Sequence, residues 1–222
     1  MTGTGIIKGP GRPTRYKLAD GTIVPSVTTI TSRFKESGGL IQWAYQKGLE
    51  GKRLYEEIQE AGDIGRQIHE FIEHDIHGEG VGVSTVPRDI RISSGFDAWV
   101  KWRDKWIERF THTEVPLISE RYHFGGTPDA LGVDRHMRPT LLDWKSAGAV
   151  YTENLCQLAA YGKLVEEVLG IKLTGGYHLV RFSKEHADLE HRHYSSLSDA
   201  LELFHLYRQA YELDKKVKQR AR

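Results

Sequence analysis

The stretch that most constrains how this chain can fold is a short apolar segment, residues 140–145, that carries an aspartate and a lysine. Such a segment is typical of a buried strand, in which side chains alternate between two faces. Leu142 and Trp144 therefore point to one face, and Asp143 and Lys145 to the other. Two charges on an apolar strand are costly to desolvate without partners. We expect either a structural ion pair or a site that uses both charges.

Polar residues elsewhere in the chain favour a functional site. Glu120 ends an earlier apolar strand, and Asp129 follows a turn formed by residues 125–127. Gln157 and Tyr161 are four residues apart, the spacing of neighbours on one face of a helix. Three carboxylates and one lysine on adjacent strands describe a site for a divalent metal ion and a phosphate group.

Length and composition are those of a globular protein. The chain has 222 residues, of which 39% are hydrophobic and 27% charged, so it can bury a substantial core. The formal net charge of +1 means that any basic surface must be local. No apolar run approaches the ~18 residues of a membrane span, and the N-terminus lacks an apolar signal segment. We expect a single domain over residues 1–222, with no membrane partner.

Cysteine content narrows the possible cofactors. The single cysteine, Cys156, excludes an internal disulfide. It also excludes a zinc site or an iron–sulfur cluster built from several cysteines of this chain. Low cysteine use indicates a reducing compartment, so we expect a cytoplasmic protein.

Apolar periodicity and turn residues predict the order of the elements. Helices are expected at residues 27–30, 40–49, 54–61, 63–76, 94–111 and 153–169, and from residue 196. Strands are expected at residues 16–18, 22–24, 115–120, 129–133, 140–145, 177–182 and 189–194. The three strands between 115 and 145 should form an antiparallel meander, and the last two strands a hairpin. This order predicts an α/β fold with a mixed central sheet flanked by helices and an elaborated helical N-terminal part.

Smaller features of the chain allow two interpretations each. Ser26 is a candidate helix cap, and its hydroxyl and that of Thr28 could also hold a phosphate at the helix N-terminus. The aromatic side chains of residues 94–111 suit a core, or a basic face that stacks on DNA. Thr152 is expected to cap one helix, and Ser196 with Asp199 another. Residues 1–13 should be flexible, and residues 214–222 should form a basic tail in which the last helix loses its order.

Oxygen ligands suit hard divalent cations such as Mg²⁺ and Mn²⁺, which also retain several waters. Asp129 and Asp143 on neighbouring strands can supply them, together with the backbone carbonyl of Trp144. A metal there polarises a phosphoryl oxygen and helps to generate hydroxide from water. Lys145 can orient that water as a base or stabilise charge on the phosphate, and the sequence leaves both roles open.

Several short motifs occur in a characteristic order along residues 26–161. They are P-S-V-T-T at 25–29, G-R-Q-I-H at 65–69, Glu120, G-T-P-D at 126–129, D-W-K at 143–145 and Q-L-A-A-Y at 157–161. Together they resemble the motifs of the PD-(D/E)XK nuclease superfamily, and more narrowly those of its RecB-like exonuclease branch. The resemblance implies a restriction-endonuclease-like core. One departure is Asp143, which stands where Glu is more common and is a permitted variant.

The resemblance implies a role for each matching residue. The catalytic residues would be Lys145, Asp143, Asp129 and Glu120, and the metal ligands would be Asp129, Asp143, the carbonyl of Trp144 and His69. Gln157 and Tyr161 would position the substrate or brace the catalytic strand, with Ser26 and Thr28 also binding substrate. His69 beside an apolar helical stripe can instead be a core histidine. The implied cofactor is Mg²⁺ or Mn²⁺, two ions per site, without the iron–sulfur cluster of some relatives.

The function that follows as an expectation is a metal-dependent DNA exonuclease. Its substrate would be single-stranded DNA or frayed ends, in DNA repair or recombination. One alternative is an endonuclease with the same chemistry. The other is a non-catalytic nucleic-acid-binding protein that keeps the fold, and the intact set of Asp129, Asp143 and Lys145 counts against it.

Overall fold

A six-stranded mixed sheet forms the centre of the computed structural model, which describes residues 6–35, 38–78, 89–146, 148–182 and 189–221. Its strand order is β1–β4–β7–β8–β9–β10. The strands are β1 (Ile7–Lys8), β4 (Ile107–Thr113), β7 (Ala130–Asp134), β8 (Pro139–Ser146), β9 (Gly176–Phe182) and β10 (Leu189–Tyr194). The pairs β1–β4 and β8–β9 are parallel, whereas β4–β7, β7–β8 and β9–β10 are antiparallel. The predicted α/β class with a mixed central sheet is confirmed.

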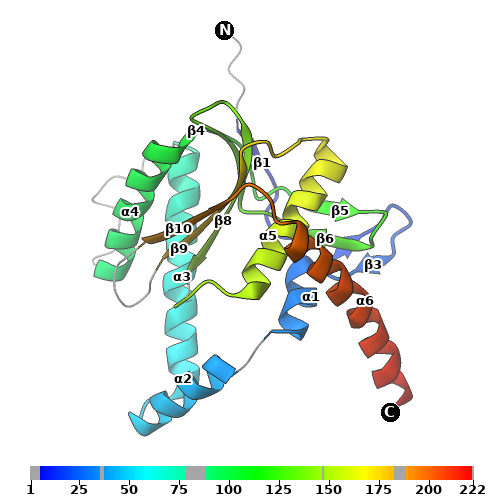
Figure 1. Ribbon diagram of the computed structural model, residues 1–222. Coiled ribbons are helices and arrows are strands. Elements are labelled where there is room, and N and C mark those ends of the chain that lie inside the picture. Colours follow the sequence, from blue (N-terminus) through cyan, green and yellow to red (C-terminus); the bar gives the residue numbers. More distant parts are fainter. Residues whose placement is uncertain (1–5, 36–37, 79–88, 147, 183–188, 222) are drawn as a thin grey trace.

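Helices cover both faces of this sheet (Figure 1). On one face, α3 (Leu54–Ile76) and α4 (Ile90–Trp106) pack on a cluster that includes Leu142 and Trp144. On the other, α1 (Val27–Arg33), α5 (Thr152–Leu164) and α6 (Ser198–Arg220) pack on a cluster that includes Leu141. Successive residues of β8 thus face different helices, as strand alternation requires. Burying each such large side chain stabilises the fold by about 1.5–3 kcal/mol.

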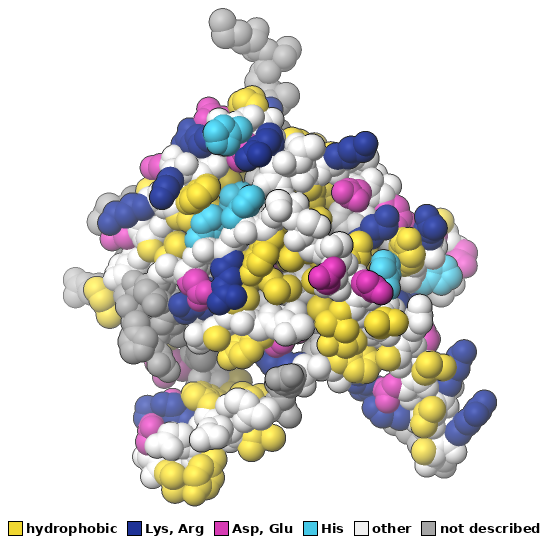
Figure 2. All heavy atoms as spheres, in the orientation of Figure 1, with side chains coloured by type: hydrophobic (Ala, Val, Ile, Leu, Met, Phe, Trp, Pro, Cys, Tyr) yellow, Lys and Arg dark blue, Asp and Glu magenta, His cyan; other side chains and the backbone are white. Residues whose placement is uncertain are grey.

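Helix α3 is continuous where the sequence predicted two helices separated by Gly62. Glycine inside a helix costs about 1 kcal/mol relative to alanine. The stripe of Ile64, Ile68, Ile72 and Ile76 is buried against α4 and the sheet, which outweighs that cost. The preceding helix α2 (Gly38–Leu49) has no buried side chain. Apolar side chains gather instead on the surface of α2 and of the projecting part of α6 (Figure 2).

The helix predicted for residues 94–111 ends at Trp106, and β4 begins at the next residue. Ile107 and Phe110 are buried in β4, which pairs with β7 across two register shifts. Residues 107–113 are rich in β-branched and aromatic side chains, so pairing with β7 wins over continuation of the helix. The aromatic side chains of α4 are mainly core, since Trp99 and Trp102 are buried.

The strand predicted at residues 115–120 does not join the central sheet. Residues Leu117–Ser119 form β5, which pairs with β6 (Phe124–Gly126) in a separate two-stranded sheet. The first strand of the meander is therefore β4. The turn expected at residues 125–127 overlaps the end of β6. A second small sheet consists of β2 (Tyr16–Lys17) and β3 (Ile23–Val24), as predicted.

Several predicted helix ends shift by a few residues. Tyr151 rather than Thr152 precedes α5, and its backbone N–H donates to the Asn154 side chain at 2.9 Å. A π-helical turn, η1 (Val165–Leu169), continues α5 to Gly170, which ends it in the left-handed conformation. Helix α6 begins at Ser198, after Leu197, without the capping box expected from Ser196 and Asp199.

Both termini are more regular than predicted. Residues 1–5 lie outside the described part of the chain, but Ile7–Lys8 forms an edge strand of the sheet. Helix α6 stays helical to Arg220 instead of losing order after residue 213. Ion pairs one turn apart, such as Arg208–Glu212 at 2.8 Å and Asp214–Lys218 at 3.1 Å, support it. No described helix combines the length and apolar character needed to cross a membrane.

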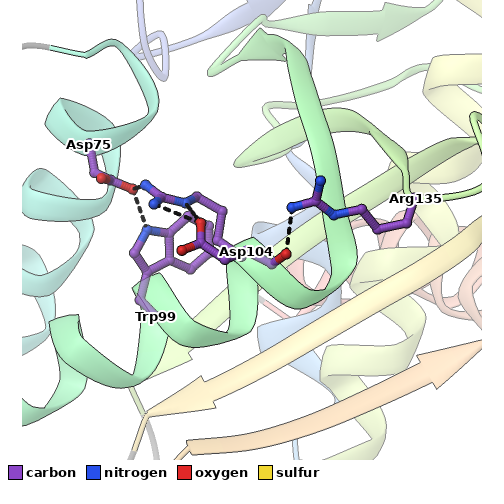
Figure 3. Close-up of polar contacts among 5 residues, drawn as sticks. Asp75, Trp99, Asp104 and Arg135 are labelled. Carbon is purple, nitrogen blue, oxygen red and sulfur yellow. Dashed lines mark hydrogen bonds and ion pairs between the residues drawn. The ribbon is translucent and has the colours of Figure 1, made fainter.

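A polar network fixes α3 against α4 (Figure 3). The carboxylate of Asp75 on α3 accepts hydrogen bonds from Trp99 Nε1 at 2.8 Å and from the Arg103 guanidinium, both on α4. Arg103 also binds Asp104, whose backbone carbonyl accepts from Arg135 in the β7–β8 turn. The network therefore joins the C-terminal end of α3 to α4, and α4 to the β7–β8 turn.

Candidate active site

A hollow of about 390 Å³ lies where β8 ends. It takes side chains from the N-terminal segment, α1, α3, β8 and the start of α5. Its lining consists of Arg12, Thr28, Thr31, Ser32, Lys35, His69, Asp129, Trp144, Lys145, Ser146, Glu153, Asn154 and Gln157. The fold thus brings together most of the site residues predicted from the sequence, although these come from segments more than a hundred residues apart.

Asp143 and Lys145 form an ion pair beside this hollow, and of the two only Lys145 lines it. Asp143 Oδ2 lies 2.5 Å from Lys145 Nζ, and the aspartate is fully buried whereas the lysine side chain is 21% exposed. Within the described residues, neither carboxylate oxygen of Asp143 makes a hydrogen bond of good geometry. Burial raises the pKa of Asp143 to about 6. The charge of Lys145 acts to lower this pKa, and the charge of Asp129 acts to raise it. This carboxylate is poorly compensated, so a cation beside it would be stabilised.

Asp129 is held beside that pair by the backbone. Its Oδ2 accepts a hydrogen bond from the Trp144 N–H at 3.0 Å. The β7–β8 ladder ends at the pair Ala130–Leu142, so β8 continues beyond the end of β7. There the Asp129 side chain, rather than a backbone carbonyl of β7, accepts the hydrogen bond from β8. Only one of its carboxylate oxygens is used in this way among the described residues, which leaves the other for a ligand.

The carboxylates of Asp129 and Asp143 are oxygen donors of the kind that a hard cation prefers. Asp129 and Asp143 would hold it, and Mg²⁺ commonly takes one or two carboxylates while waters and substrate phosphates complete its shell. Over the described ranges, no three His, Cys, Asp or Glu side chains are placed to hold an ion together.

His69 lies at the border between core and hollow, as its place beside the apolar stripe predicted. Its ring meets Trp144 edge-on, with 6.1 Å between centroids and 69° between planes. It is half-buried and lines the hollow together with Asp129. The ring thus contacts Trp144 and lies within electrostatic reach of Asp143.

Gln157 and Tyr161 act as a unit on α5. Gln157 Nε2 donates to Tyr161 Oη at 2.9 Å, and Gln157 reaches the hollow while Tyr161 is buried behind it. Burial is the main reason that the pKa of Tyr161 is raised. A Cβ on Gly126 would lie 2.6 Å from the Tyr161 ring, so only glycine allows this packing. Tyr161 thus braces Gln157 and does not itself line the hollow.

Two predicted residues are used elsewhere. Glu120 is exposed and accepts a hydrogen bond from the Ala19 N–H at 2.8 Å, outside the hollow. Its predicted strand belongs to the β5–β6 sheet, which carries it away from Asp129. Ser26 caps α1 by accepting from the Thr29 N–H at 3.0 Å, so its hydroxyl serves the helix. Thr28, in contrast, does line the hollow.

The sequence did not predict two charged residues that lie near the carboxylates. Burial raises the pKa of Glu114, and the charges of Glu73 and Asp129 raise it further, so Glu114 rather than Glu120 is the acid near Asp129. Its N–H donates to the Asp129 carbonyl at 3.1 Å. Glu114 has a left-handed backbone conformation, with φ of 48°. No residue pattern in the sequence predicted this conformation.

Arg12 is the second missed residue, and it lines the hollow. Burial lowers the pKa of Arg12, but the charges of Asp129 and Asp143 act to raise it, and the pKa lies above its ordinary value overall. The guanidinium thus lies within electrostatic reach of the carboxylates. The stretch that carries it was predicted to be flexible, so nothing in the sequence placed it here.

Comparison with known proteins finds matches among solved structures alone. No protein-family profile matches the sequence, and no curated protein does. The crystal structure of a protein from Eubacterium rectale, provisionally described as an exonuclease, aligns with 78% of this chain at 13% identity and a TM-score of 0.35. The chain covers 65% of the length of that protein.

Proposed function

We propose that this protein is a metal-dependent nuclease that hydrolyses phosphodiester bonds. The observation that carries the proposal is the buried Asp143–Lys145 ion pair, open on its lysine side to a hollow that Asp129 also lines. A purely structural pair has no need of a second carboxylate or of an opening to solvent. A metal ion bound by Asp129 and Asp143 would polarise a phosphoryl oxygen and lower the pKa of bound water.

The protein's own groups have distinct tasks in this proposal. Lys145, the exposed member of the pair, stabilises the negative charge that develops on the phosphate or orients the attacking water. Trp144 supplies the N–H that orients Asp129. Gln157, held by Tyr161, presents an amide to the substrate. His69 on α3 lines the same hollow as Asp129 and is the candidate for a further metal ligand.

The substrate we propose is DNA, with single strands or frayed ends preferred and cleavage from an end. The hollow is lined by the cations Arg12 and Lys35, of which Lys35 pairs with Glu153 at 3.5 Å, and by the hydroxyls of Thr28, Thr31 and Ser32. Cations and hydroxyl donors beside a metal site suit a phosphate backbone. Arg12 is the cation most directly able to hold the phosphate next to the one being cleaved.

The test is cleavage of end-labelled linear single strand, linear duplex and closed single-stranded circle. Each is incubated with Mg²⁺, Mn²⁺, Ca²⁺ or EDTA. We expect degradation of the linear single strand with Mg²⁺ or Mn²⁺, binding with little turnover in Ca²⁺, and no cleavage in EDTA. Full activity after exhaustive EDTA treatment would rule out metal-assisted hydrolysis.

The same assay separates the alternatives. Cutting of the closed circle would show an endonuclease, and binding without cleavage in every metal would show a non-catalytic nucleic-acid-binding protein. An RNA strand of the same sequence reports the sugar preference. Lys145→Ala is the negative control, and Lys172→Ala, which removes an exposed lysine outside the hollow, is the matched control for loss of one charge.

A further inference from the structure

A second hollow, of about 550 Å³, lies between the β5–β6 hairpin and α6. None of its lining residues is shared with the candidate active site. The hairpin turn contributes Arg121 and Tyr122, and α6 contributes His205, Arg208, Leu213 and Lys216 among others. Its volume is in the range of pockets that hold small ligands.

Hydrogen bonds join the hairpin turn to both η1 and α6. Ser119 Oγ accepts from the Tyr122 N–H at 2.9 Å and donates to Glu167 Oε1 of η1 at 2.8 Å. Arg208 Nε of α6 donates to the His123 carbonyl at 3.1 Å. The hollow is therefore a built feature of the contact between hairpin and helix.

The charge of the lining is mainly positive. Glu212 is its only acidic side chain and is already paired with Arg208 at 2.8 Å. Over the described residues, Arg121 and Lys216 have no carboxylate partner. Two cations without counter-charges, at the rim of one hollow, favour an anionic ligand.

Rings and apolar surface lie beside these cations. The Tyr122 and His205 rings are 4.7 Å apart, and Arg121 lies 5.2 Å from the Tyr122 centroid. Leu213 is 62% exposed although it lines the hollow. Lys163 also lies 5.7 Å from the Tyr122 centroid. A ligand that joins an apolar ring to an anion would suit both the exposed Leu213 and the cations.

We propose that this second hollow binds a nucleotide, with its phosphate on Arg121 and Lys216 and its base against Tyr122 and Leu213. The nucleotide is either free or part of a single strand, since both present the same chemistry. Base stacking on aromatic side chains combined with cationic contacts to phosphate is the usual way in which proteins hold single strands. The site adds to the proposed function but does not depend on cleavage.

The test measures fluorescence anisotropy of a labelled oligothymidylate in EDTA, where no hydrolysis is expected. Arg121→Ala/Lys216→Ala should weaken binding roughly fivefold or more at low salt and lower the slope of log K against log salt by about 1.4. Tyr122→Leu should weaken binding of the oligonucleotide but not of an abasic strand of equal length. Lys172→Ala/Arg192→Ala, which removes two exposed cations elsewhere, is the matched control and should bind as wild type.

The other outcomes are equally informative. Competition by thymidine monophosphate that the double variant loses would support the site with a free nucleotide as its ligand. Unchanged binding of both ligands by the double variant would overturn the proposal, as would an abasic strand that binds as tightly as the oligonucleotide. Failure of cleavage in the separate metal assay would leave these binding results standing, so the two proposals fail independently.

Discussion

The carboxylate of Asp129 accepts a hydrogen bond from the backbone N–H of Trp144, at 3.0 Å, at the point where the β7–β8 ladder has ended. This contact places Asp129 beside the Asp143–Lys145 pair without using a side chain of β8. The orientation of the Asp129 carboxylate therefore depends on the backbone of β8. It follows that charge and orientation at Asp129 can be separated by mutation.

Asp129→Asn should abolish cleavage with little loss of stability. The asparagine Oδ1 can still accept from the Trp144 N–H, but the negative charge needed for a cation is gone. Asp129→Ala loses both, and should lower the free energy of unfolding by a further 1–2 kcal/mol or so because a buried N–H is left unpaired. Urea denaturation in EDTA and cleavage rates in Mn²⁺ measure the two effects. Equal destabilisation by both variants would mean that the hydrogen bond contributes nothing.

Lys145→Ala should reduce cleavage at least a hundredfold, about 2.7 kcal/mol of transition-state stabilisation. DNA binding in Ca²⁺ should largely survive, because Arg12 and Lys35 remain. Single-turnover rates at saturating enzyme measure the chemical step, with Lys172→Ala as the control. Cleavage by Lys145→Ala at the wild-type rate would show that the active site lies elsewhere.

His69→Ala distinguishes a metal-facing histidine from a core histidine. Since His69 lines the hollow, we expect a higher Mn²⁺ midpoint and a lower rate, with little change of melting temperature in metal-free protein. A packing role predicts the reverse, a loss of about 1–3 kcal/mol of stability with an unchanged metal midpoint. Melting in EDTA and a Mn²⁺ titration of the rate, on the same preparations, decide between them.

In metal-free protein, Asp143 should make the fold less stable at neutral pH than in mild acid. Its folded pKa is about 6 because of burial, against 3.8 for an ordinary aspartate. Between these values the folded chain keeps a proton that the unfolded chain has released, so the free energy of unfolding falls as pH rises.

Asp143→Asn removes this contribution. The stability of the variant relative to wild type should therefore increase between about pH 4 and pH 6, by roughly 1 kcal/mol or more. The measurement is urea denaturation in EDTA across this range. Saturating Mn²⁺ should recover the stability that the wild-type protein loses, and it should do so only at pH 7. Parallel stability curves for the two proteins would contradict the raised pKa.

Gly126→Ala should disturb the site from a distance. Its Cβ would lie 2.6 Å from the Tyr161 ring, and overpacking of this kind costs typically 1–3 kcal/mol. Displacement of Tyr161 would also release Gln157. We expect lower stability and a higher KM for the oligonucleotide, whereas Gly148→Ala, which has open space around it, should change neither. An unchanged KM would show that Gln157 does not contribute to substrate binding.

Local regularities of the chain were sufficient for several features of the site. The alternation of a strand alone places Asp143 and Lys145 on one face, and helical spacing alone brings Gln157 next to Tyr161. Ser26 as a helix cap and Gly170 as a helix end follow from side-chain and backbone chemistry within a few residues. Each of these depends only on short-range geometry, which the sequence by itself determines.

Contacts between distant segments decided the rest. The end of α4 at Trp106 depends on pairing with β7, and the continuity of α3 through Gly62 depends on burial of isoleucines against α4. The pairing of β5 with β6 removes Glu120 from the central sheet. The acid near Asp129 is instead Glu114, which follows β4. Arg12 reaches the hollow from the segment that follows the edge strand β1. Propensity and periodicity carry no information on such pairings, because their free energy comes from surfaces that meet only in the folded chain.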